Sequence, residues 1–583
     1  AAGDFAVIGP NSTGFLNYFD RTALWPVHDH APRHMAKGVA ILSASGGVLF
    51  NYSVNQRSLH AAVMIGIGNQ AVVGVADYID VLVDDPRVTA IGLFLEDIGD
   101  PVAFSAAAAR AFARDLPIVA VKTGRSAKGA EVAQTHSGAL VAPDDLIDAL
   151  FRRCGVIRVR TLPEFDETLK MLTIPQRPTG RRVALLTNSG GEKALAADAA
   201  DSTLITFPEP SPEAAKDLRQ QIPDFTAVSN PFDYNAHFAG KDIFSMENEA
   251  ALQRCFQTMI ADGYDVAVLL NGYRSRPDGT VDPRESVLNP TRDAFIATCH
   301  AVGISGAIAS VMPEHMPHPQ REYLIAHGIA PLMGLNEAMV AIDAAIRRTE
   351  RNGTLMAGDI TLPEVPATPT RGVLTGEATD KAALGAAGLA LPLHRTATTE
   401  AEAQAAAAAL GYPVVLKALD PVIAHKAKAG GVALNLRSAD EVASSMAAMR
   451  DRLDAGGYAL RKVLIERMVS GARHELILGV TRAAGFGQVL VLGRGGVDTE
   501  TFGLADKLLL PVSAMELGRF VDAARALAPL SHRAREGVLA AATVVAAYAV
   551  SHYDSLLALD INPLIVGVDD SVTAVDVLIE TES

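Results

Sequence analysis

A unit of strand, glycine turn and helix occurs twice in this sequence, and it constrains the fold more than any other feature. The first copy spans residues 38–50, where an apolar run leads through Ser45-Gly46-Gly47 into a helical pattern. The second copy spans residues 183–196 and turns through Ser189-Gly190-Gly191. Gly46 and Gly190 lie 144 residues apart, and alternating strand and helix patterns follow each copy. The repeat predicts two related, doubly wound α/β domains in tandem.

Each Ser-Gly-Gly turn also has the features of an anion-binding site. The backbone N–H groups and the dipole at a helix N-terminus favour negative charge, and glycine lets a ligand approach closely. Many turns between a strand and a helix carry this tripeptide without binding anything, so the turns alone do not assign a ligand.

Composition narrows the class of protein. With 583 residues, the chain should hold roughly three to five domains. Its net charge of −15 argues against nucleic acid or an anionic membrane as the main partner. The three cysteines, Cys154, Cys255 and Cys299, form no close pair, so neither a disulfide framework nor a cysteine-rich zinc site is expected. No signal peptide is visible, and the apolar run 537–550 is shorter than the ~20 residues that span a bilayer, so a cytoplasmic location is expected.

His136 lies in a stretch of small residues, 133–140, that follows a strand-like run at 116–121. The next helix is expected after Pro143, with acids in its first turn. A loop imidazole among small residues is easily approached, and it could be a base, a ligand, a covalent phosphate carrier or an ordinary surface histidine.

Glu96 follows the predicted strand at residues 90–95. In a parallel sheet the carboxyl ends of the strands face the binding crevice. Glu96 could therefore orient His136 by accepting a hydrogen bond from one ring nitrogen. The alternative is a solvated acid at the end of a strand.

The last 210 or so residues carry a different set of polar residues. Lys417 ends an apolar strand, where its charge needs a partner such as a nucleotide phosphate. Glu466 and Glu475 are expected on neighbouring strands, within reach of a ribose or an adenine. Asn562 and Asp576 offer hard oxygen ligands that suit Mg²⁺ bridging phosphates.

The order of these features resembles an ATP-grasp domain and, over the whole chain, the ADP-forming acyl-CoA synthetase family, which is related to succinyl-CoA synthetase. The resemblance rests on Gly411–Lys417, on His425-Lys426 with Gly430-Gly431, on Phe486-Gly487 with Gly493 and Gly495-Gly496, and on Asp560–Leu564. Thr135–Leu140 matches the family's phosphohistidine loop, and Leu95-Glu96 matches its histidine-orienting glutamate. Ser12 stands where the family commonly has a cysteine.

The resemblance implies an α/β architecture with two flavodoxin-like, doubly wound CoA-ligase domains followed by an ATP-grasp domain. The N-terminal CoA-binding Rossmann domain is expected to be mostly absent. The implied boundaries are the tail of that domain at 1–35, CoA-ligase domains at 36–175 and 181–350, a linker at 351–371 and the ATP-grasp domain at 372–583.

The resemblance also implies a reaction and its site. ATP would phosphorylate His136, the phosphoryl group would pass to a carboxylic acid, and CoA would displace phosphate to form acyl-CoA. Expected substrates and cofactors are ATP/ADP, Mg²⁺, coenzyme A and a small carboxylic acid, with a homodimer as the assembly. The implied residues are His136, Glu96 and a relay histidine, His425, for catalysis; Ser45, Gly46, Gly47, Ser189, Gly190, Gly191, Gly495 and Gly496 for phosphate; Lys417, Glu466, Met468 and Glu475 for the nucleotide; Asp560, Asn562 and Asp576 for the metal; and Asn11 and Ser12 for the substrate.

Two other functions fit parts of the pattern. One is a regulatory acyl-CoA or nucleotide sensor with weak or no catalysis, like the protein acetyltransferases that carry this scaffold. The other is an unrelated ATP-grasp carboxylate–amine ligase, which has no use for a phosphohistidine loop on a separate domain. The acid–CoA ligase is favoured by the presence of His136, Lys417, Asn562 and Asp576. The sequence does not identify the acid, because relatives use short-chain acids, hydroxycinnamates and sulfur-containing carboxylates.

Overall fold

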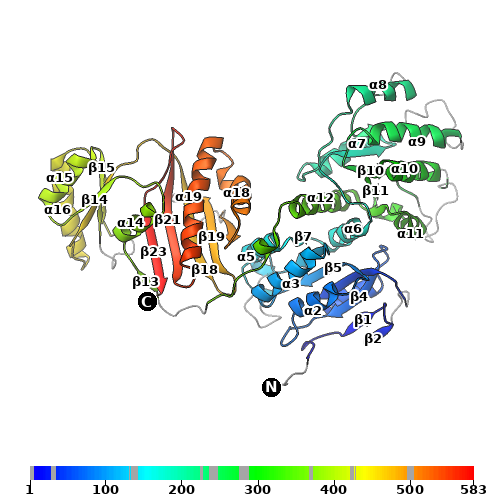
Figure 1. The fold of residues 1–583 in the computed structure, drawn as a ribbon, viewed down its shortest axis with the longest axis horizontal. Coiled ribbons are helices and arrows are strands. Elements are labelled where there is room, and N and C mark those ends of the chain that lie inside the picture. The colour runs from blue at the N-terminus through cyan, green and yellow to red at the C-terminus, as the bar shows by residue number, and fades with distance from the viewer. Residues whose placement is uncertain are drawn as a thin grey trace. The chain divides into compact units, whose positions relative to one another are not determined.

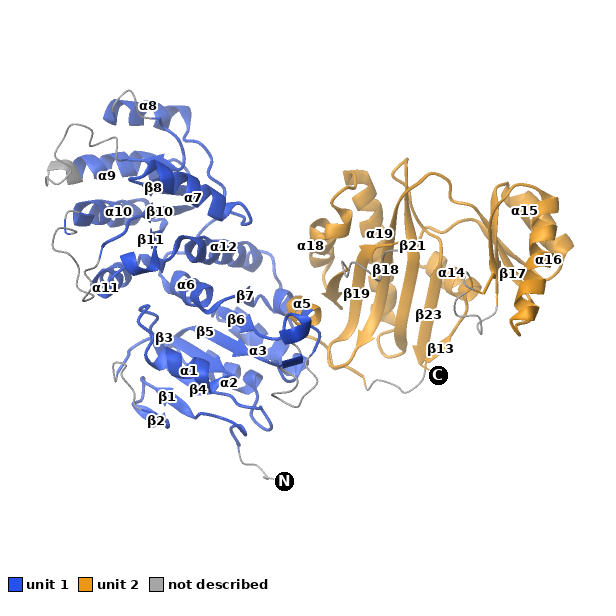
Figure 2. Cartoon of the chain, turned by 180° about the vertical axis from the view of Figure 1, so that it is seen from behind, with its two compact units in different colours: residues 1–144, 151–361 blue, residues 145–150, 362–583 orange. Residues whose placement is uncertain are grey.

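The chain folds into two compact units in the computed structural model (Figure 2). The first unit comprises residues 1–144 and 151–361, and the second comprises residues 145–150 and 362–583. Each unit has its own sheets and its own buried core. The structure describes residues 6–27, 34–129, 131–132, 142–222, 227–234, 247–274, 286, 288–366, 372–419, 426, 429–495 and 505–582.

A seven-stranded sheet forms the first half of the first unit (Figure 1). Its order is β2-β1-β4-β3-β5-β6-β7. Strands β3 to β7 run parallel, whereas β1 and β2 form an antiparallel hairpin beside β4. The parallel part has the flavodoxin-like order, and its winding reverses between β3 and β5. The strands are β1 (Phe15–Asn17), β2 (Thr22–Leu24), β3 (Gly38–Ser43), β4 (Ala61–Gly66), β5 (Val88–Leu95), β6 (Ile118–Lys122) and β7 (Ile157–Val159).

Apolar sequence explains why the inner strands form. Every residue of β3 and of β6 is buried, as parallel strands covered on both faces require. Two of the connecting helices, α3 and α6, begin at polar caps. The side chains of Asp100 and Thr161 accept N–H groups in the first turns of these helices, which have no partner inside the helix. The helices are α1 (Gly46–Ser53), α2 (Val75–Val83), α3 (Pro101–Ala113), α5 (Asp144–Cys154) and α6 (Leu162–Thr173).

A five-stranded parallel sheet forms the second half of the first unit, in the order β12-β11-β10-β8-β9. This is the same winding order as in the first sheet, reversing between β8 and β10. The prediction of two flavodoxin-like, doubly wound domains is confirmed. The elements are β8 (Val183–Thr187), α7 (Gly190–Ala200), α8 (Pro212–Gln221), β9 (Phe232–Asp233), α9 (Glu247–Ile260), β10 (Val266–Leu270), α10 (Asn289–Val302), β11 (Ser305–Ser310), α11 (His318–Ala326), β12 (Ala330–Met333) and α12 (Leu335–Asn352).

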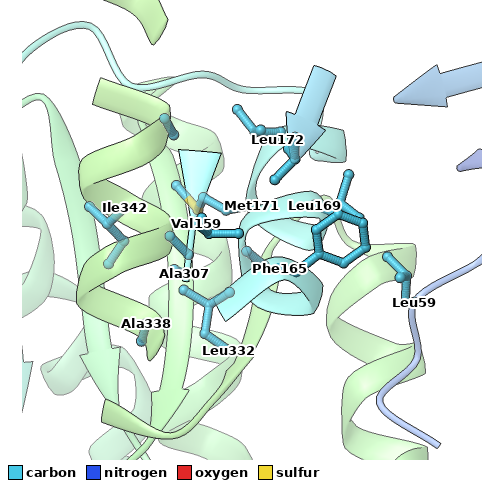
Figure 3. Close-up of a cluster of buried hydrophobic side chains, with 14 of the residues drawn as sticks. Leu59, Val159, Phe165, Leu169, Met171, Leu172, Ala307, Leu332, Ala338 and Ile342 are labelled. Carbon is cyan, nitrogen blue, oxygen red and sulfur yellow. The ribbon is translucent and has the colours of Figure 1, made fainter. Parts of the chain in front are cut away.

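One hydrophobic core joins the two sheets of this unit (Figure 3). Helix α6 packs against both α12 and β5. Its residues Phe165 and Leu169 are fully buried in the core at this contact. Leu332 of β12 and Ala338 of α12 belong to the same cluster. Because both sheets share this core, the two halves of the first unit form one folding body.

Buried charges at the same joint are paired. Glu167 of α6 accepts a hydrogen bond from the Arg57 guanidinium at 2.8 Å and another from the Met333 N–H at 2.8 Å. Lys170, one turn further along, lies 2.7 Å from Glu167 and donates to the Pro331 carbonyl at 2.7 Å. The joint is therefore specific as well as apolar, since each buried charge has a partner.

The second unit contains two antiparallel sheets. A four-stranded sheet has the order β14-β17-β15-β16, and a seven-stranded sheet has the order β13-β23-β21-β18-β19-β20, with β22 paired to β21. The elements are β13 (Gly372–Leu374), α14 (Glu377–Ala386), β14 (His394–Ala397), α15 (Glu400–Leu410), β15 (Val414–Ala418), β16 (Val432–Leu436), α16 (Ala439–Ala455), β17 (Val463–Arg467), β18 (Ala472–Ala483), β19 (Gly487–Arg494), β20 (Asp506–Leu509), α18 (Ala514–Ala523), α19 (His532–Ser551), β21 (Leu556–Gly567), β22 (Val572–Ala574) and β23 (Val577–Glu582).

Helix α19 is apolar and 20 residues long, which by length and composition would suffice to cross a membrane. In the structure it is a core helix of the second unit. Its residues Val538, Ala542 and Val545 are fully buried in one cluster with Leu478 and Leu559 of the sheet. Packing against the sheet accounts for its apolar face.

The structure differs from the predicted organisation at the N-terminus. Strands β1 and β2 fall within residues 1–35, which the sequence assigns to a separate domain, yet both join the seven-stranded sheet. The described residues before β1, 6–14, form no strand. The loop after β4 instead donates from Asn69 N–H to the Pro10 carbonyl at 2.9 Å.

The predicted linker at 351–371 begins with ordered structure. A short helix, α13 (Ala357–Ile360), lies within it. The Arg153 guanidinium donates to the carbonyl of Ile360 at 3.0 Å and to that of Thr361 at 2.9 Å. These bonds attach the start of the linker to the first unit.

Candidate functional site

The first Ser-Gly-Gly turn lies at the carboxyl end of β3, where the winding of the sheet reverses. Ser45 is the N-cap of α1, and its side chain accepts the Val48 N–H at 3.4 Å. Ser43 supports the cap, because its hydroxyl accepts the Ser45 N–H at 3.1 Å and donates to the Ser45 carbonyl at 2.8 Å. Within the described residues, no hydrogen bond uses the N–H groups of Gly46 and Gly47. These donors have the geometry of an anion site.

The two glycines of this turn differ in what surrounds them. A Cβ on Gly46 would overlap the methyl group of Thr13. Among the described residues, a Cβ on Gly47 would meet only the Ser45 hydroxyl, at 4.0 Å. Of the residues that the structure describes, none fills the space beside Gly47, whereas Thr13 fills the space beside Gly46.

Glu96 and Lys122 follow neighbouring strands at the same edge. Glu96 comes directly after β5, and Lys122 is the last residue of β6. Glu96 therefore shares an edge with Ser45, because parallel strands end together. The Lys122 side chain is buried and donates to the Thr123 carbonyl at 2.6 Å. Burial lowers the pKa of Lys122, which Asp144 and Glu96 partly offset.

The loop that carries His136 is described only at its ends. Residues 133–141, and His136 with them, lie outside the described residues, so the position of His136 and its contact with Glu96 stay predictions. Strand β6 ends at Lys122, and α5 begins at Asp144 after Pro143. A helix that follows a parallel strand begins at the carboxyl edge of the sheet, so the connection starts and ends on the edge that carries Ser45 and Glu96.

The two predicted substrate residues differ in how free they are. The Ser12 hydroxyl donates to the Gly66 carbonyl at 2.5 Å and accepts the Gly14 N–H at 3.0 Å. Asn11 is exposed, and its amide lies 3.5 Å from the Asn69 side-chain oxygen. The Ser12 side chain therefore stabilises a turn, and the Asn11 side chain is the more accessible of the two to a substrate.

The second Ser-Gly-Gly turn has the same backbone but other neighbours. Ser189 is the N-cap of α7, and its N–H donates to the Thr187 hydroxyl at 3.2 Å, as Ser45 donates to Ser43. A carboxylate oxygen of Asp233 lies 3.8 Å from the Cβ position of Gly190. Beside Gly191, a Cβ would meet only the Ser189 hydroxyl within the described part of this domain, at 3.9 Å. An acid therefore faces this turn, which makes it less favourable for an anion than the first.

The second unit contains a cluster of six charged side chains, which we term the lysine–acid cluster. It joins α14, the four-stranded sheet and the loop before β23. It holds three acids and three lysines, so the formal charges balance. Its members are Glu377, Lys381, Lys417, Lys426, Glu466 and Asp576.

Lys417 is at the centre of the cluster. Its Nζ lies 2.8 Å from Glu377 Oε1 and 2.9 Å from Glu466 Oε2, and it donates to the Val575 carbonyl at 2.9 Å. Asp576 Oδ1 is more distant, at 3.7 Å. The Lys417 side chain is only 6% exposed, whereas that of Asp576 is 49% exposed. Asp576 is therefore the member that solvent and ligands reach most easily.

The other two lysines complete the cluster. Lys381 Nζ lies 3.0 Å from Glu377 Oε1, forms an ion pair with Glu466 and donates to the Val575 carbonyl at 2.7 Å. Lys426 pairs with the second oxygen of Glu377. Glu377 therefore contacts all three lysines.

Secondary structure brings these residues together. Val415 of β15 is opposite Glu466 of β17, so Lys417 is the diagonal neighbour of Glu466 on the same face. Glu377 and Lys381 are four residues apart on α14, which places them on one face of the helix.

Four members of the cluster, Glu377, Lys381, Lys417 and Asp576, have pKa values shifted from their ordinary values. Burial works to raise the pKa of Glu377, but Lys417, Lys381 and Lys426 outweigh it and hold that pKa below its usual range. Burial works to lower the pKa of Lys417, but Asp576, Glu466 and Glu377 raise it above its ordinary value. Burial raises the pKa of Asp576 to about 6. Lys417 therefore stays charged, whereas the Asp576 carboxyl has a pKa of about 6.

Asp576 of this cluster has two further oxygen-bearing side chains near it, those of Asp560 and Asn562. Asp560 and Asn562 are two residues apart on β21 and share a face. The Asn562 N–H donates to the Asp576 carbonyl at 3.3 Å, which places Asp576 beside them. In the described part of the chain no three His, Cys, Asp or Glu side chains could hold a metal by themselves. Two carboxylates and an amide fit Mg²⁺ that also binds phosphate oxygens, since Mg²⁺ seldom uses an all-protein cage.

Glu475 and Met468, which the sequence also assigns to the nucleotide, are not members of the lysine–acid cluster. The expectation that Glu466 and Glu475 share neighbouring strands is wrong, because β17 belongs to the four-stranded sheet and β18 to the seven-stranded one. Strands that follow each other in sequence suggested a hairpin, but the chain crosses between sheets here. Glu475 is exposed, and its carbonyl accepts the Gly495 N–H at 2.8 Å. The Met468 N–H donates to the Pro413 carbonyl at 2.9 Å. His425 and Gly496 lie outside the described residues.

Sequence reasoning missed Glu377 and Lys381. Both are fully or almost fully buried, with 1% and 0% of their surface exposed. An acid and a lysine four residues apart in an Ala-rich helix are typical of a solvated surface pair. Only the position of α14 beside β15 makes them part of the site.

Comparison with known proteins agrees with this layout. Residues 36–172 match the succinyl-CoA ligase-like flavodoxin domain, and residues 367–581 match an ATP-grasp domain. A trans-feruloyl-CoA synthase from an unknown prokaryotic organism is 30% identical over 84% of this chain and 68% of its own length. The ADP-forming 4-hydroxybutyrate–CoA ligase of Nitrosopumilus maritimus is 27% identical over 88% of this chain and 72% of its own.

One similar solved structure is the dinucleotide-forming acetyl-coenzyme A synthetase 1 of Ca. Korarchaeum cryptofilum in complex with phosphate and ADP. It is 21% identical, covers 61% of this chain and 73% of its own, and superposes with a TM-score of 0.49.

Proposed function

Since this chain belongs to the ADP-forming acyl-CoA synthetases, a family of acid–thiol ligases, we propose that it makes acyl-CoA through a phosphorylated His136. In the first step a ring nitrogen of His136 attacks the γ-phosphorus of ATP, so that a P–N bond forms and the bond to ADP breaks. The phosphoryl group then passes to a carboxylate oxygen of the acid, which gives an acyl phosphate and frees His136. Finally the CoA sulfur, having lost its proton, attacks the acyl carbon and phosphate leaves. A covalent carrier divides one difficult step into easier ones.

The observation that carries this proposal is the arrangement of residues at the carboxyl edge of strands β3 to β6, in the seven-stranded sheet of the first unit. The α1 N-terminus presents the N–H groups of Gly46 and Gly47 there without protein partners among the described residues. Glu96 shares this edge, and the connection that contains His136 starts and ends on it. We assign the α1 N-terminus to the transferred phosphate, which it would stabilise by preorganised donors. Glu96 would orient the His136 ring by accepting its other N–H.

The lysine–acid cluster is assigned to the nucleotide. Lys417 would bind phosphate oxygens, and its charge is secured by Glu377 and Glu466. Glu466 is then a counter-ion of the lysines rather than a ribose ligand. Asp560, Asn562 and Asp576 would hold Mg²⁺, which when bound neutralises phosphate charge.

The acid is assigned only as a class, a small carboxylic acid. The relatives named above act on ferulate and 4-hydroxybutyrate, which differ in size and polarity. A panel of acids, with ADP release from the full-length protein and CoA as the readout, would identify the substrate. A homodimer in the cytoplasm remains the expected assembly and location, and light scattering would measure the assembly.

Labelling with ATP that carries ³²P in its γ-phosphate tests the carrier. The wild-type protein is expected to take up acid-labile label, and His136→Ala is expected to take up none. The label should leave on addition of the acid and CoA, because the phosphoryl group is an intermediate.

His532→Ala is the matched control, because the His532 side chain is 88% exposed at the start of α19. It should label like the wild type. Label that survives His136→Ala would contradict the assigned carrier. A wild-type protein that binds ADP but takes up no label would favour the regulatory alternative.

A further inference from the structure

Thr13 lies where the N-terminus of α1 meets the carboxyl end of β4. A Cβ on Gly46, the first residue of α1, would overlap the Thr13 methyl group. A Cβ on Gly66, the last residue of β4, would overlap the Thr13 hydroxyl. Both neighbours are glycine, so the Thr13 side chain fills the space that their own side chains would need.

The contribution of Thr13 is its shape rather than a hydrogen bond. Its hydroxyl is buried and has no hydrogen-bond partner among the described residues. The neighbouring Ser12 hydroxyl, by contrast, makes two hydrogen bonds that hold the turn. A buried hydroxyl without a partner costs stability, so packing must be what the Thr13 side chain supplies.

We infer that Thr13 is a positioning residue for the phosphate site: wedged between β4 and α1, it sets where the Gly46 and Gly47 N–H groups point. This inference rests on the proposed function of the α1 N-terminus. It also separates the roles of the two glycines. Gly46 is glycine because Thr13 occupies its side, and Gly47 is glycine because the ligand needs the open space there.

The distances allow this contact to be tested by moving one methyl group. Thr13→Ser removes the methyl that a Cβ on Gly46 would overlap. The remaining Thr13 Cβ and Oγ1 lie 3.5 and 3.7 Å from that Cβ position, which is ordinary van der Waals contact. Gly46→Ala alone should therefore impair phosphate binding and lower the melting temperature. Together with Thr13→Ser it should be tolerated, because the methyl group added at Gly46 replaces the one removed from Thr13 and the total volume is conserved.

Gly66 provides a matched control that the same change cannot rescue. Its Cβ position lies 3.0 Å from the Thr13 backbone nitrogen and 3.4 Å from the Gly14 carbonyl oxygen. Backbone atoms do not change in Thr13→Ser. Gly66→Ala should therefore lower the melting temperature equally in the wild type and in the Thr13→Ser background.

The full-length enzyme assayed in the reverse direction reports on this site, with inorganic phosphate, ADP and the acyl-CoA that the acid panel identifies. Gly46→Ala is expected to raise the KM for phosphate about tenfold, as losing one charge-assisted hydrogen bond would. The KM for ADP should not change, because ADP is assigned to the second unit. In Gly46→Ala with Thr13→Ser, both the KM for phosphate and the melting temperature should return close to the wild-type values.

Two results would overturn the inference. A double variant as impaired as Gly46→Ala alone would exclude the contact with Thr13. A KM for ADP that rises in parallel with that for phosphate would indicate general disruption instead of positioning. Gly47→Ala tests the proposed function separately: an unchanged KM for phosphate would exclude the phosphate site itself, whatever the melting temperatures of the Gly46 variants.

Discussion

Each buried charge of the lysine–acid cluster depends on its partners. Glu377 contacts Lys381, Lys417 and Lys426, and its side chain has no exposed surface. Its pKa is held low by these lysines against the effect of burial. Removing this one carboxylate leaves three lysines facing two acids, one of them half exposed.

Glu377→Gln is expected to destabilise the second unit by about 3–5 kcal/mol, the usual cost of leaving a buried charge without its partner. Glutamine keeps the shape of the side chain, so packing losses stay small. Urea unfolding of the purified protein would measure the change in the free energy of unfolding. Glu400→Gln is the control, because Glu400 pairs with Arg450 at the surface, where such pairs contribute about 0–1 kcal/mol. Equal effects in the two variants would contradict the role of Glu377.

Asp576 makes nucleotide binding depend on pH if it helps to hold Mg²⁺. Burial raises its pKa to about 6, so the carboxylate becomes protonated, and loses its charge, as the pH falls below that value. The affinity for ADP in the presence of Mg²⁺ should therefore weaken about tenfold between pH 7 and pH 5.

Isothermal titration calorimetry on the wild type and on Asp576→Asn measures this effect. The variant should bind ADP with Mg²⁺ more weakly at pH 7 and should lack the added loss at pH 5. Titration of the nucleotide phosphates is common to both proteins and cancels in the comparison. An equally steep pH dependence in Asp576→Asn would exclude Asp576 as the titrating group.

Among the elements, α6 joins the two flavodoxin-like sheets of the first unit. Its apolar side packs against α12 and β5 (Figure 3). Its buried Glu167 and Lys170 bind groups from both halves. That α6 contacts both sheets is difficult to recognise from sequence. The amphipathic pattern and the Thr161 cap indicate the helix, but these local signals do not show that the helix packs against the second sheet.

Phe165→Ala tests this joint. Phe165 is fully buried at the centre of the shared core, so the cavity should cost about 3–5 kcal/mol of the free energy of unfolding. Leu195→Ala on α7 is the control, since Leu195 is 51% exposed and should change stability by about 0.5 kcal/mol or less. Urea unfolding followed by circular dichroism would measure both. A small effect at Phe165 would indicate that the two sheets fold without the shared core.

Element boundaries were predictable where the local signal was strong. The strand and helix on either side of each Ser-Gly-Gly turn form as expected, as β3 with α1 and β8 with α7. The β1–β2 hairpin was missed because its six residues form two short strands that are stable only beside β4.

For the whole molecule, the proposed chemistry divides between the two units. The phosphate site and the His136 loop are assigned to the first unit, and the nucleotide cluster to the second. A phosphoryl carrier on a loop suits such a division, because the covalent intermediate takes the place of direct contact between the acid and ATP. The match to two separate domain families follows the same division.

The sequence by itself determined the class of fold, the ligase family and the residues that local pattern makes conspicuous, such as Lys417 in an apolar strand and the two glycine turns. These follow from periodicity, from glycine at helix N-termini and from the order of motifs, all of which are local along the chain. The tertiary structure decided which residues meet. It brought Glu377 and Lys381 to Lys417, separated Glu466 from Glu475 and set Thr13 against Gly46. Such contacts join residues tens to hundreds of positions apart or depend on the path between sheets, and packing settles them.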